Sequence, residues 1–360
     1  MNSSIKLYGF CLLMTIGLVT NGQTPKETAL EKGKQAIKLE DEEGKYDEAI
    51  KLFKEAQQLD PEDITYPYEI SYSYTSKKEY KKAIEILEKL LTHKDVYGRV
   101  YQALGNNYDY LGMPDKAIET YKEGLRKFPH SGELYLEMGN MLRQKNEYDK
   151  SLPFYEKGIE EDPGFASNYY RASKLFCSSN EVVWGMIYGE IFMNLERNSK
   201  RTSEISKLLF DTYKAKIKIY KDSISVDFCK IIIDVKDIPD KGNIKFPFCM
   251  IFGNALMMAI IDLKNIDINS LDQLRTRFIH EYFKNDNQTK YPNILYDYQQ
   301  RIEKAGHSEA YNHWILMKGD EDGFDKWKEK NKTQWSDFIT WFNDNQLKLS
   351  QTNKFYRKQY

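Results

Sequence analysis

A short motif that recurs every 34 residues is the feature of this sequence that most constrains its fold. The first four residues of each copy end in a small residue, and these small residues are Ala49, Ala83, Ala117 and Ser151. An apolar or aromatic residue follows each of them by four positions, and a proline closes three of the four copies. Copies in register at this spacing indicate a chain built from stacked structural units.

A second signature precedes the later copies and has the same period. Its aromatic, apolar and small residues follow helical spacing: Tyr101, Leu104, Gly105 and Tyr108, then Tyr135, Met138, Gly139 and Leu142, with Tyr169, Ala172 and Phe176 one period later. Glycine inside a helix costs about 1 kcal/mol relative to alanine. Gly105 and Gly139 therefore predict places where two helices approach closely and a large neighbouring side chain fills the gap. Each unit is then a helix pair that must stack on the next pair.

These two signatures resemble the helix A and helix B positions of the tetratricopeptide repeat family, and the likeness covers residues 30 to 163. The resemblance implies an all-α fold, a right-handed α-solenoid of about five helix pairs over residues 23–198. It weakens in the last unit, where Gly185 and Gly189 occupy helix B positions and Arg197 replaces the terminal proline.

Residues 199–360 are expected to form a mostly α C-terminal domain of no recognised family, because the 34-residue rhythm stops at Thr202. Alternating apolar and β-branched residues predict a short strand or hairpin near 224–236. Helices are expected at 246–263, from a capping box at Ser270 to about Phe283, and at 293–317 and 323–345. The last ten residues are polar and basic, which predicts a frayed end.

The first 22 residues have the pattern of a cleaved secretory signal. Lys6 precedes an apolar run from Leu7 to Val19, and Thr20 and Gly22 place small residues before a cut at Gln23. We therefore expect an exported protein in the periplasm or cell envelope of a Gram-negative bacterium, with no membrane span after cleavage. An uncleaved N-terminal anchor is the alternative.

Cleavage would leave three cysteines, Cys177, Cys229 and Cys249. Three cysteines cannot all pair, so the chain has no disulfide framework. A single Cys229–Cys249 bridge would suit an oxidising compartment, but we favour three buried thiols that pack as small apolar side chains.

The sequence indicates no catalytic or cofactor site. The formal charge is −1 and no long basic run occurs, which argues against a nucleic-acid partner. The five histidines lack metal-ligand spacing, and no phosphate-binding glycine loop or nucleophile turn is present. We therefore predict a protein that is not an enzyme and uses no metal and no cofactor.

The family resemblance implies instead a concave groove, lined by helix A residues, that binds a protein or peptide partner. These residues are Tyr68, Tyr72, Arg99, Gln102, Asn106, Tyr110, Asn140, Arg143, Tyr170 and Lys174. An asparagine amide can pair with an extended peptide backbone, and arginine can hold a carboxylate with two hydrogen bonds. The two-carboxylate clamp of chaperone-tail binders is absent, because the first unit offers only Lys34 and Lys38 and the second offers tyrosines.

We predict a non-enzymatic scaffold or adaptor that binds a partner peptide or helix in this groove. The alternative is an enzyme or small-ligand receptor in the C-terminal domain, where Gln299, Glu303 and His307 would line a polar cleft near His313. A closed aromatic core there would remove this alternative. A third hypothesis, a structural spacer, would be favoured by a convex face more apolar than the groove.

Overall fold

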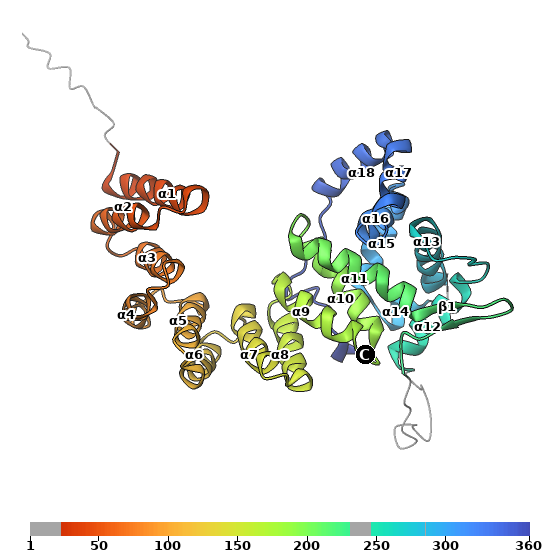
Figure 1. The fold of residues 1–360 in the computed structure, drawn as a ribbon, viewed down its shortest axis with the longest axis horizontal. Helices are drawn as coiled ribbons and strands as arrows, with labels where there is room; N and C mark the ends of the chain where they lie inside the picture. Colours follow the sequence, from red (N-terminus) through yellow and green to blue (C-terminus); the bar gives the residue numbers. More distant parts are fainter. Residues whose placement is uncertain (1–22, 231–245, 285) are drawn as a thin grey trace, which may run out of the picture. The chain divides into compact units, whose positions relative to one another are not determined.

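The computed structural model describes residues 23–230, 246–284 and 286–360. The predicted signal segment and the β-branched run at 231–235 lie outside these described residues. The described chain is predominantly helical and forms two compact units, which divide between Asp95 and Val96 (Figure 1). The predicted all-α class is confirmed.

The first unit consists of two helix pairs, α1 (Pro25–Glu43) with α2 (Tyr46–Leu59) and α3 (Thr65–Ser76) with α4 (Tyr80–Leu90). A capping box between Thr24 and Glu27 begins α1, and Gly44 ends it in the left-handed conformation that glycine adopts readily. Ala49 and Ala83, two of the recurring small residues, are fully buried. Their small side chains let neighbouring helices pack closely.

Three more helix pairs open the second unit, and one further helix follows them. They are α5 (Gly98–Tyr110), α6 (Pro114–Lys127), α7 (Gly132–Gln144), α8 (Tyr148–Glu161), α9 (Ala166–Cys177), α10 (Val182–Leu195) and α11 (Lys200–Lys216). Lys127 lies over the Tyr101 ring and Lys116 over the Tyr108 ring, so α5 and α6 run antiparallel. The described repeats are thus consecutive antiparallel helix pairs.

Helix α11 continues the stacking beyond the point where the sequence rhythm was expected to stop. Arg201 Nη1 donates to Ser167 Oγ at 2.9 Å, and Glu204 accepts from the Tyr170 hydroxyl at 2.5 Å. Both pairs join residues 34 positions apart. The repeat register therefore persists in the packing after its aromatic signature has been lost.

The remainder of the second unit contains a small β-hairpin and further helices. Strand β1 (Ile217–Ile219) pairs antiparallel with β2 (Ile224–Val226), so the predicted hairpin is present but begins earlier than expected. The helices are α12 (Phe248–Ala259), α13 (Ile268–Lys284), α14 (Asn287–Lys290), α15 (Ile294–Lys304), α16 (Ser308–Leu316), α17 (Glu321–Lys330) and α18 (Lys332–Asp344), with a 3₁₀ turn at Arg357–Gln359. No helix among the described residues is long and apolar enough to cross a membrane.

The helices predicted at 293–317 and 323–345 are each divided in two. Gly306, with a φ of 79°, separates α15 from α16, and Asn331 separates α17 from α18. The start of α13 was also misplaced, because Asp267 rather than Ser270 accepts the capping bond, from the Ser270 N–H at 2.8 Å. Apolar spacing continues across such breaks, which is why it failed to reveal them.

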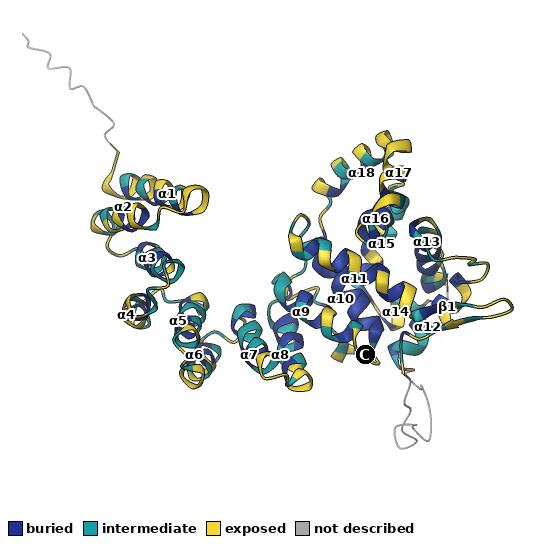
Figure 2. Ribbon diagram, viewed as in Figure 1, coloured by how far each residue is buried: buried dark blue, intermediate teal, exposed yellow. Residues whose placement is uncertain are grey.

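One hydrophobic core extends from Tyr155 in α8 to Phe355 near the C-terminus. Helix α10 is buried from Val182 to Asn194, as its dark ribbon in Figure 2 shows. The domain boundary expected between residues 198 and 199 lies inside this core. The last repeat and the C-terminal helices therefore share a single hydrophobic interior.

Cys229 and Cys249 form a disulfide, with their Cα atoms 5.9 Å apart. The favoured interpretation of three free thiols was therefore wrong. Cys177 remains a thiol, and burial raises its pKa to about 11.

The C-terminal tail is packed rather than frayed, which corrects a second expectation. Arg357 Nε and Nη2 each donate to Glu156 at 2.8 Å, and Nη1 donates to Glu181 at 2.8 Å. Phe355 is buried, and the Tyr360 ring stacks on Trp184 with centroids 6.1 Å apart. The tail thus closes the core formed by α8 and α10.

Replacing Arg357 with alanine should destabilise the protein by about 3 kcal/mol, because it leaves the Glu156 carboxylate, 3% exposed, without its partner. Urea unfolding of the full chain measures this change. Lys358→Ala removes an exposed neighbouring charge and should alter the free energy of unfolding by less than about 0.5 kcal/mol. Equal effects of the two substitutions would contradict the proposed role of the Arg357–Glu156 ion pair.

A buried acid lies between α1 and α3 in the first unit. Glu40 is 6% exposed and accepts a hydrogen bond from the Ser73 hydroxyl. Burial raises the pKa of Glu40 from 4.5 to about 7, against the lowering effect of that hydrogen bond, and the charges of Glu69 and Asp41 raise it further. The folded protein therefore holds this proton more tightly than the unfolded chain.

The free energy of unfolding should consequently fall as pH rises from about 4.5 to about 7, by on the order of 3 kcal/mol for this group. Glu40→Gln removes the ionisable group, so its stability advantage over wild type should grow across that window and then level off. Denaturant unfolding at a series of pH values measures the difference. Glu31→Gln, at an exposed position on the same helix, should show no such growth.

Candidate partner-binding face

The first helices of the repeats in the second unit form one continuous face, called the A-helix face below. Helix α5 contacts α7, α7 contacts α9, and α9 contacts α11. Side chains about 34 residues apart in sequence therefore lie at equivalent positions on neighbouring helices of this face. Most of the predicted binding residues lie on this face.

Polar side chains on the A-helix face bond from one repeat to the next. Arg99 Nε donates to Glu133 Oε1 at 3.1 Å, and Gln102 Nε2 donates to Glu137 Oε1 at 2.9 Å. Arg99 and Glu133 also line a cleft of about 580 Å³. These bonds couple α5 to α7 and satisfy two of the acids on the face.

A glycine, an asparagine and a tyrosine form a compact module between α5 and α6. A Cβ on Gly105 would lie 2.2 Å from Tyr121 Cε1, so only glycine leaves room for this ring. The Tyr121 side chain is 1% exposed, and its hydroxyl donates to Asn106 Oδ1 at 2.6 Å. Burial raises the pKa of Tyr121, which keeps this hydroxyl protonated as a donor.

The same module recurs one repeat later. A Cβ on Gly139 would lie 2.4 Å from Tyr155 Cε1, and the Tyr155 hydroxyl donates to Asn140 Oδ1 at 3.1 Å. In both repeats the tyrosine fixes the orientation of the amide that sequence analysis singled out. The sequence showed the tyrosines only as packing residues, so this hydrogen bond was missed.

The two asparagine amides differ in what they leave available. Asn140 Nδ2 donates to Glu137 Oε2 at 3.0 Å, so both ends of this amide are engaged. Asn106 Nδ2 makes no hydrogen bond within the described part of the chain. Asn106 therefore presents a donor of fixed orientation.

Arg143 on α7 has an uncommitted donor. Its Nε is buried and has no hydrogen-bond partner among the described residues. Burial raises the pKa of the nearby Tyr155, the charges of Arg171 and Arg143 and a side-chain hydrogen bond with Arg143 lower it, and the charge of Glu137 raises it further. Two positive side chains therefore lie beside Tyr155, and Nε is the Arg143 nitrogen that is left without a partner.

Tyr170 serves as an anchor rather than an exposed contact. It is 6% exposed, and its ring packs on Phe192 with centroids 5.2 Å apart. The charged groups of Arg171, Lys174 and Arg201 lie 5.4, 5.0 and 5.2 Å from the ring centroid. Sequence analysis had not identified Arg171 and Arg201 as part of this cluster.

The three other predicted tyrosines lie at the end of α5 and in the first unit. Tyr110, at the end of α5, is 55% exposed. Tyr68 and Tyr72 lie on α3 in the first unit, where Tyr72 is 50% exposed and Tyr68 is half-buried. The assignment of all ten residues to a binding site stays a prediction.

Of the residues expected to line a polar cleft, Gln299 and Glu303 line one small pocket, and the two histidines pack on aromatic rings. Gln299 donates to buried Glu190, and Glu303 pairs with His280. His307 follows the break at Gly306 and packs on Trp341, with ring centroids 5.4 Å apart. The His313 ring stacks on the Trp327 ring, with centroids 4.2 Å apart.

Two family models, both described as tetratricopeptide repeat, match residues 42–106 and 103–164. Residues 42–164 therefore belong to that family, and the chain contains tetratricopeptide repeats. Repeats of this kind indicate a protein–protein interaction scaffold. A stretch of 88 residues is 33% identical to the Hsp70-Hsp90 organising protein of Plasmodium falciparum (isolate 3D7), and it spans 22% of this chain but only 16% of that protein.

Similar solved structures include TTC0263, a thermophilic TPR protein of Thermus thermophilus, at 17% identity and a TM-score of 0.42, covering 50% of this chain and 98% of that one. Pseudomonas aeruginosa pilF is 16% identical with a TM-score of 0.42, covering 53% and 85%. YrrB, described as a TPR protein with an unusual peptide-binding site, is 20% identical with a TM-score of 0.31, covering 48% and 89%. Likenesses of this strength carry no argument about function.

Gly139→Ala should destabilise the protein by about 1–3 kcal/mol, because its methyl group would overlap the buried Tyr155 ring. The matched control is Gly253→Ala in α12, where an added Cβ meets nothing within 4 Å and should stabilise the helix by up to about 1 kcal/mol. Chemical denaturation measures both. An unchanged free energy of unfolding for Gly139→Ala would contradict the close packing of Tyr155 on Gly139.

Proposed function

We propose that this tetratricopeptide-repeat protein is an exported adaptor whose A-helix face binds an extended segment of a partner protein. The partner contributes a carboxylate to Arg143 and a backbone carbonyl to Asn106. The observation that carries the proposal is the buried Arg143 Nε, which has no hydrogen-bond partner among the described residues. A buried donor without a partner costs about 1–3 kcal/mol, and a rotation of the half-buried Arg143 side chain that brings Nε to a ligand carboxylate recovers this energy.

The surrounding charges favour an acidic segment over a basic one. Glu133, Glu137 and Glu204 already accept hydrogen bonds from other side chains of the face. Arg171 and Arg143 leave a positive region beside Tyr155. An extended peptide also suits Asn106, whose amide is held in place by Tyr121 and offers Nδ2 to any backbone carbonyl.

The disulfide supports export. Cys229–Cys249 is a bridge of the kind that persists in oxidising compartments and is rare in the cytosol. The N-terminal pattern of a charged residue, an apolar run and small residues before Gln23 agrees with this location. We therefore assign the adaptor to the periplasm or cell envelope.

The partner is to be found by photo-crosslinking in the native host. In the test variant a crosslinking amino acid replaces Gln144, which is exposed at the end of α7. In the control variant the same amino acid replaces Lys122, which is exposed on α6. Mass spectrometry of the products identifies the crosslinked segment. Intact mass of the recovered protein tests export through cleavage before Gln23.

Binding of the recovered segment, made as a synthetic peptide, then tests Arg143. Arg143→Gln should weaken binding at least tenfold, since a hydrogen bond to a charged group contributes about 1.5–3 kcal/mol. Arg126→Gln changes an exposed arginine on α6 and should leave the dissociation constant unchanged. Equal crosslinking at positions 122 and 144, or an unchanged constant for Arg143→Gln, would overturn the proposal.

A further inference from the structure

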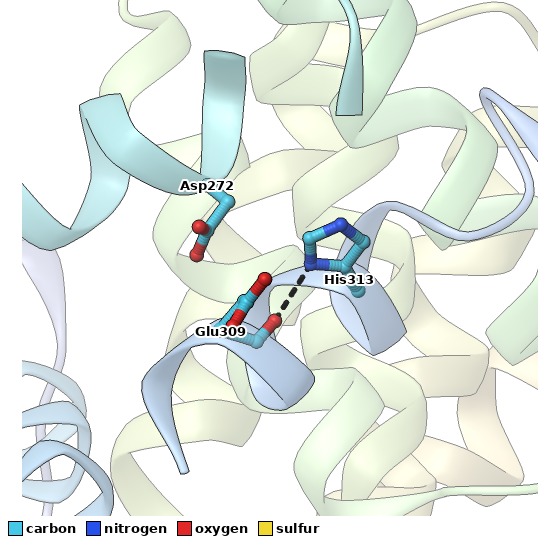
Figure 3. Close-up of side chains that lie close together, drawn as sticks. All are labelled: Asp272, Glu309 and His313. Carbon is cyan, nitrogen blue, oxygen red and sulfur yellow. Dashed lines mark hydrogen bonds between the residues drawn. The ribbon is translucent and has the colours of Figure 1, made fainter. Parts of the chain in front are cut away.

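Three potential metal ligands converge between α13 and α16, far in sequence from the A-helix face. Asp272 lies near the start of α13, and Glu309 and His313 lie one turn apart on α16. Their candidate ligand atoms all lie within 4.8 Å of one another. Figure 3 shows the three side chains gathered between the two helices, with a Glu309 oxygen on the side of the imidazole ring. This spacing needs only small side-chain adjustments to surround one ion.

The two carboxylates are held in place by donors from neighbouring helices. Trp327 Nε1 donates to Glu309 Oε1 at 2.7 Å, and Gln334 Nε2 donates to Glu309 Oε2 at 3.0 Å. Asn312 Nδ2 donates to Asp272 Oδ1 at 2.9 Å. Outer hydrogen bonds of this kind orient the ligands of protein metal sites. Each carboxylate still has lone pairs for a metal.

The two carboxylates have no directly bonded lysine or arginine among the described residues, although the charge of Arg275 acts on Asp272. In the part of the chain that the structure describes, no lysine or arginine forms an ion pair with Asp272 or Glu309. Arg275, one turn along α13, is committed to the buried Glu190 at 2.7 Å. Two half-buried carboxylates beside each other repel unless a cation or a proton lies between them.

His313 supplies the nitrogen ligand of the cluster and is held in a fixed position. The side chain is 1% exposed, and both ring nitrogens face oxygen atoms: Nδ1 faces the Glu309 carbonyl at 2.8 Å and Nε2 faces Asn269 Oδ1 at 3.2 Å. In a neutral imidazole one nitrogen carries the hydrogen and the other has a lone pair of the kind that binds transition metals.

We propose that Asp272, Glu309 and His313 bind one divalent transition-metal ion, which joins α13 to α16. The metal replaces the hydrogen on Nδ1, the nitrogen that faces the carboxylates in Figure 3. The remaining N–H, on Nε2, then donates to Asn269. An imidazole with two carboxylates suits Zn²⁺ or Mn²⁺, whereas Ca²⁺ and Mg²⁺ prefer oxygen ligands alone.

Isothermal titration of the tag-free, chelator-treated full chain with ZnCl₂ and with MnCl₂ tests the site. One equivalent of at least one metal should bind, and Asp272→Asn should weaken that binding by about 100-fold. Gln334→Ala should weaken it by about 10- to 100-fold through loss of the outer hydrogen bond. The control, His280→Gln, removes a histidine that also pairs with a glutamate but lies outside the cluster, and should leave the constant unchanged.

A spectrum of the unaltered protein guards against variants that fail to fold. Co²⁺ added to the wild-type chain should give a d–d absorption band at one equivalent, and Zn²⁺ should remove it by competition. Absence of saturable binding by Zn²⁺ and Mn²⁺ would overturn the proposal and indicate that a proton neutralises the cluster. An equal loss of binding in His280→Gln would overturn it as well, because the ion would then lie elsewhere.

Discussion

Close approach of helices at glycine is the interaction on which the repeat array depends. Gly105 and Gly139 leave a space that the rings of Tyr121 and Tyr155 fill from the second helix of the same pair. A ring that enters so deeply carries its hydroxyl through the pair to the A-helix face, where it meets Asn106 or Asn140. Packing and recognition are therefore linked, because the residue that seals the core also orients the amide.

The array needs a cover at its C-terminal end, since each helix pair leaves an apolar face open. This chain supplies α11 in repeat register and then a helical region that buries α10 on all sides. Arg357 ties the tail to Glu156 in the preceding repeat. The C-terminal region is thus a continuation of the solenoid core, whatever else it binds.

The repeat helices were predictable because their contacts are local and recur at a fixed period. The tail contacts were not, since Arg357 and Glu156 are 201 positions apart and no pattern links them, and the disulfide could be named only as an alternative to free thiols. Helix breaks at Gly306 and Asn331 escaped detection because apolar spacing runs through them. On the A-helix face the helical positions were predictable from the period, whereas the partners of Gln102 and Tyr170 are side chains of the next helix on the face.

Most polar groups on the A-helix face already have partners within the protein, and this limits what can select a ligand. A segment that displaced the Arg99–Glu133 or Gln102–Glu137 bonds would exchange one hydrogen bond for another, with little net gain. Hydrogen-bond donors that lack an acceptor differ, because binding removes the free-energy cost of the unpaired donor in the free protein. Selectivity should therefore depend on Arg143 and Asn106 more than on the many residues that line the face.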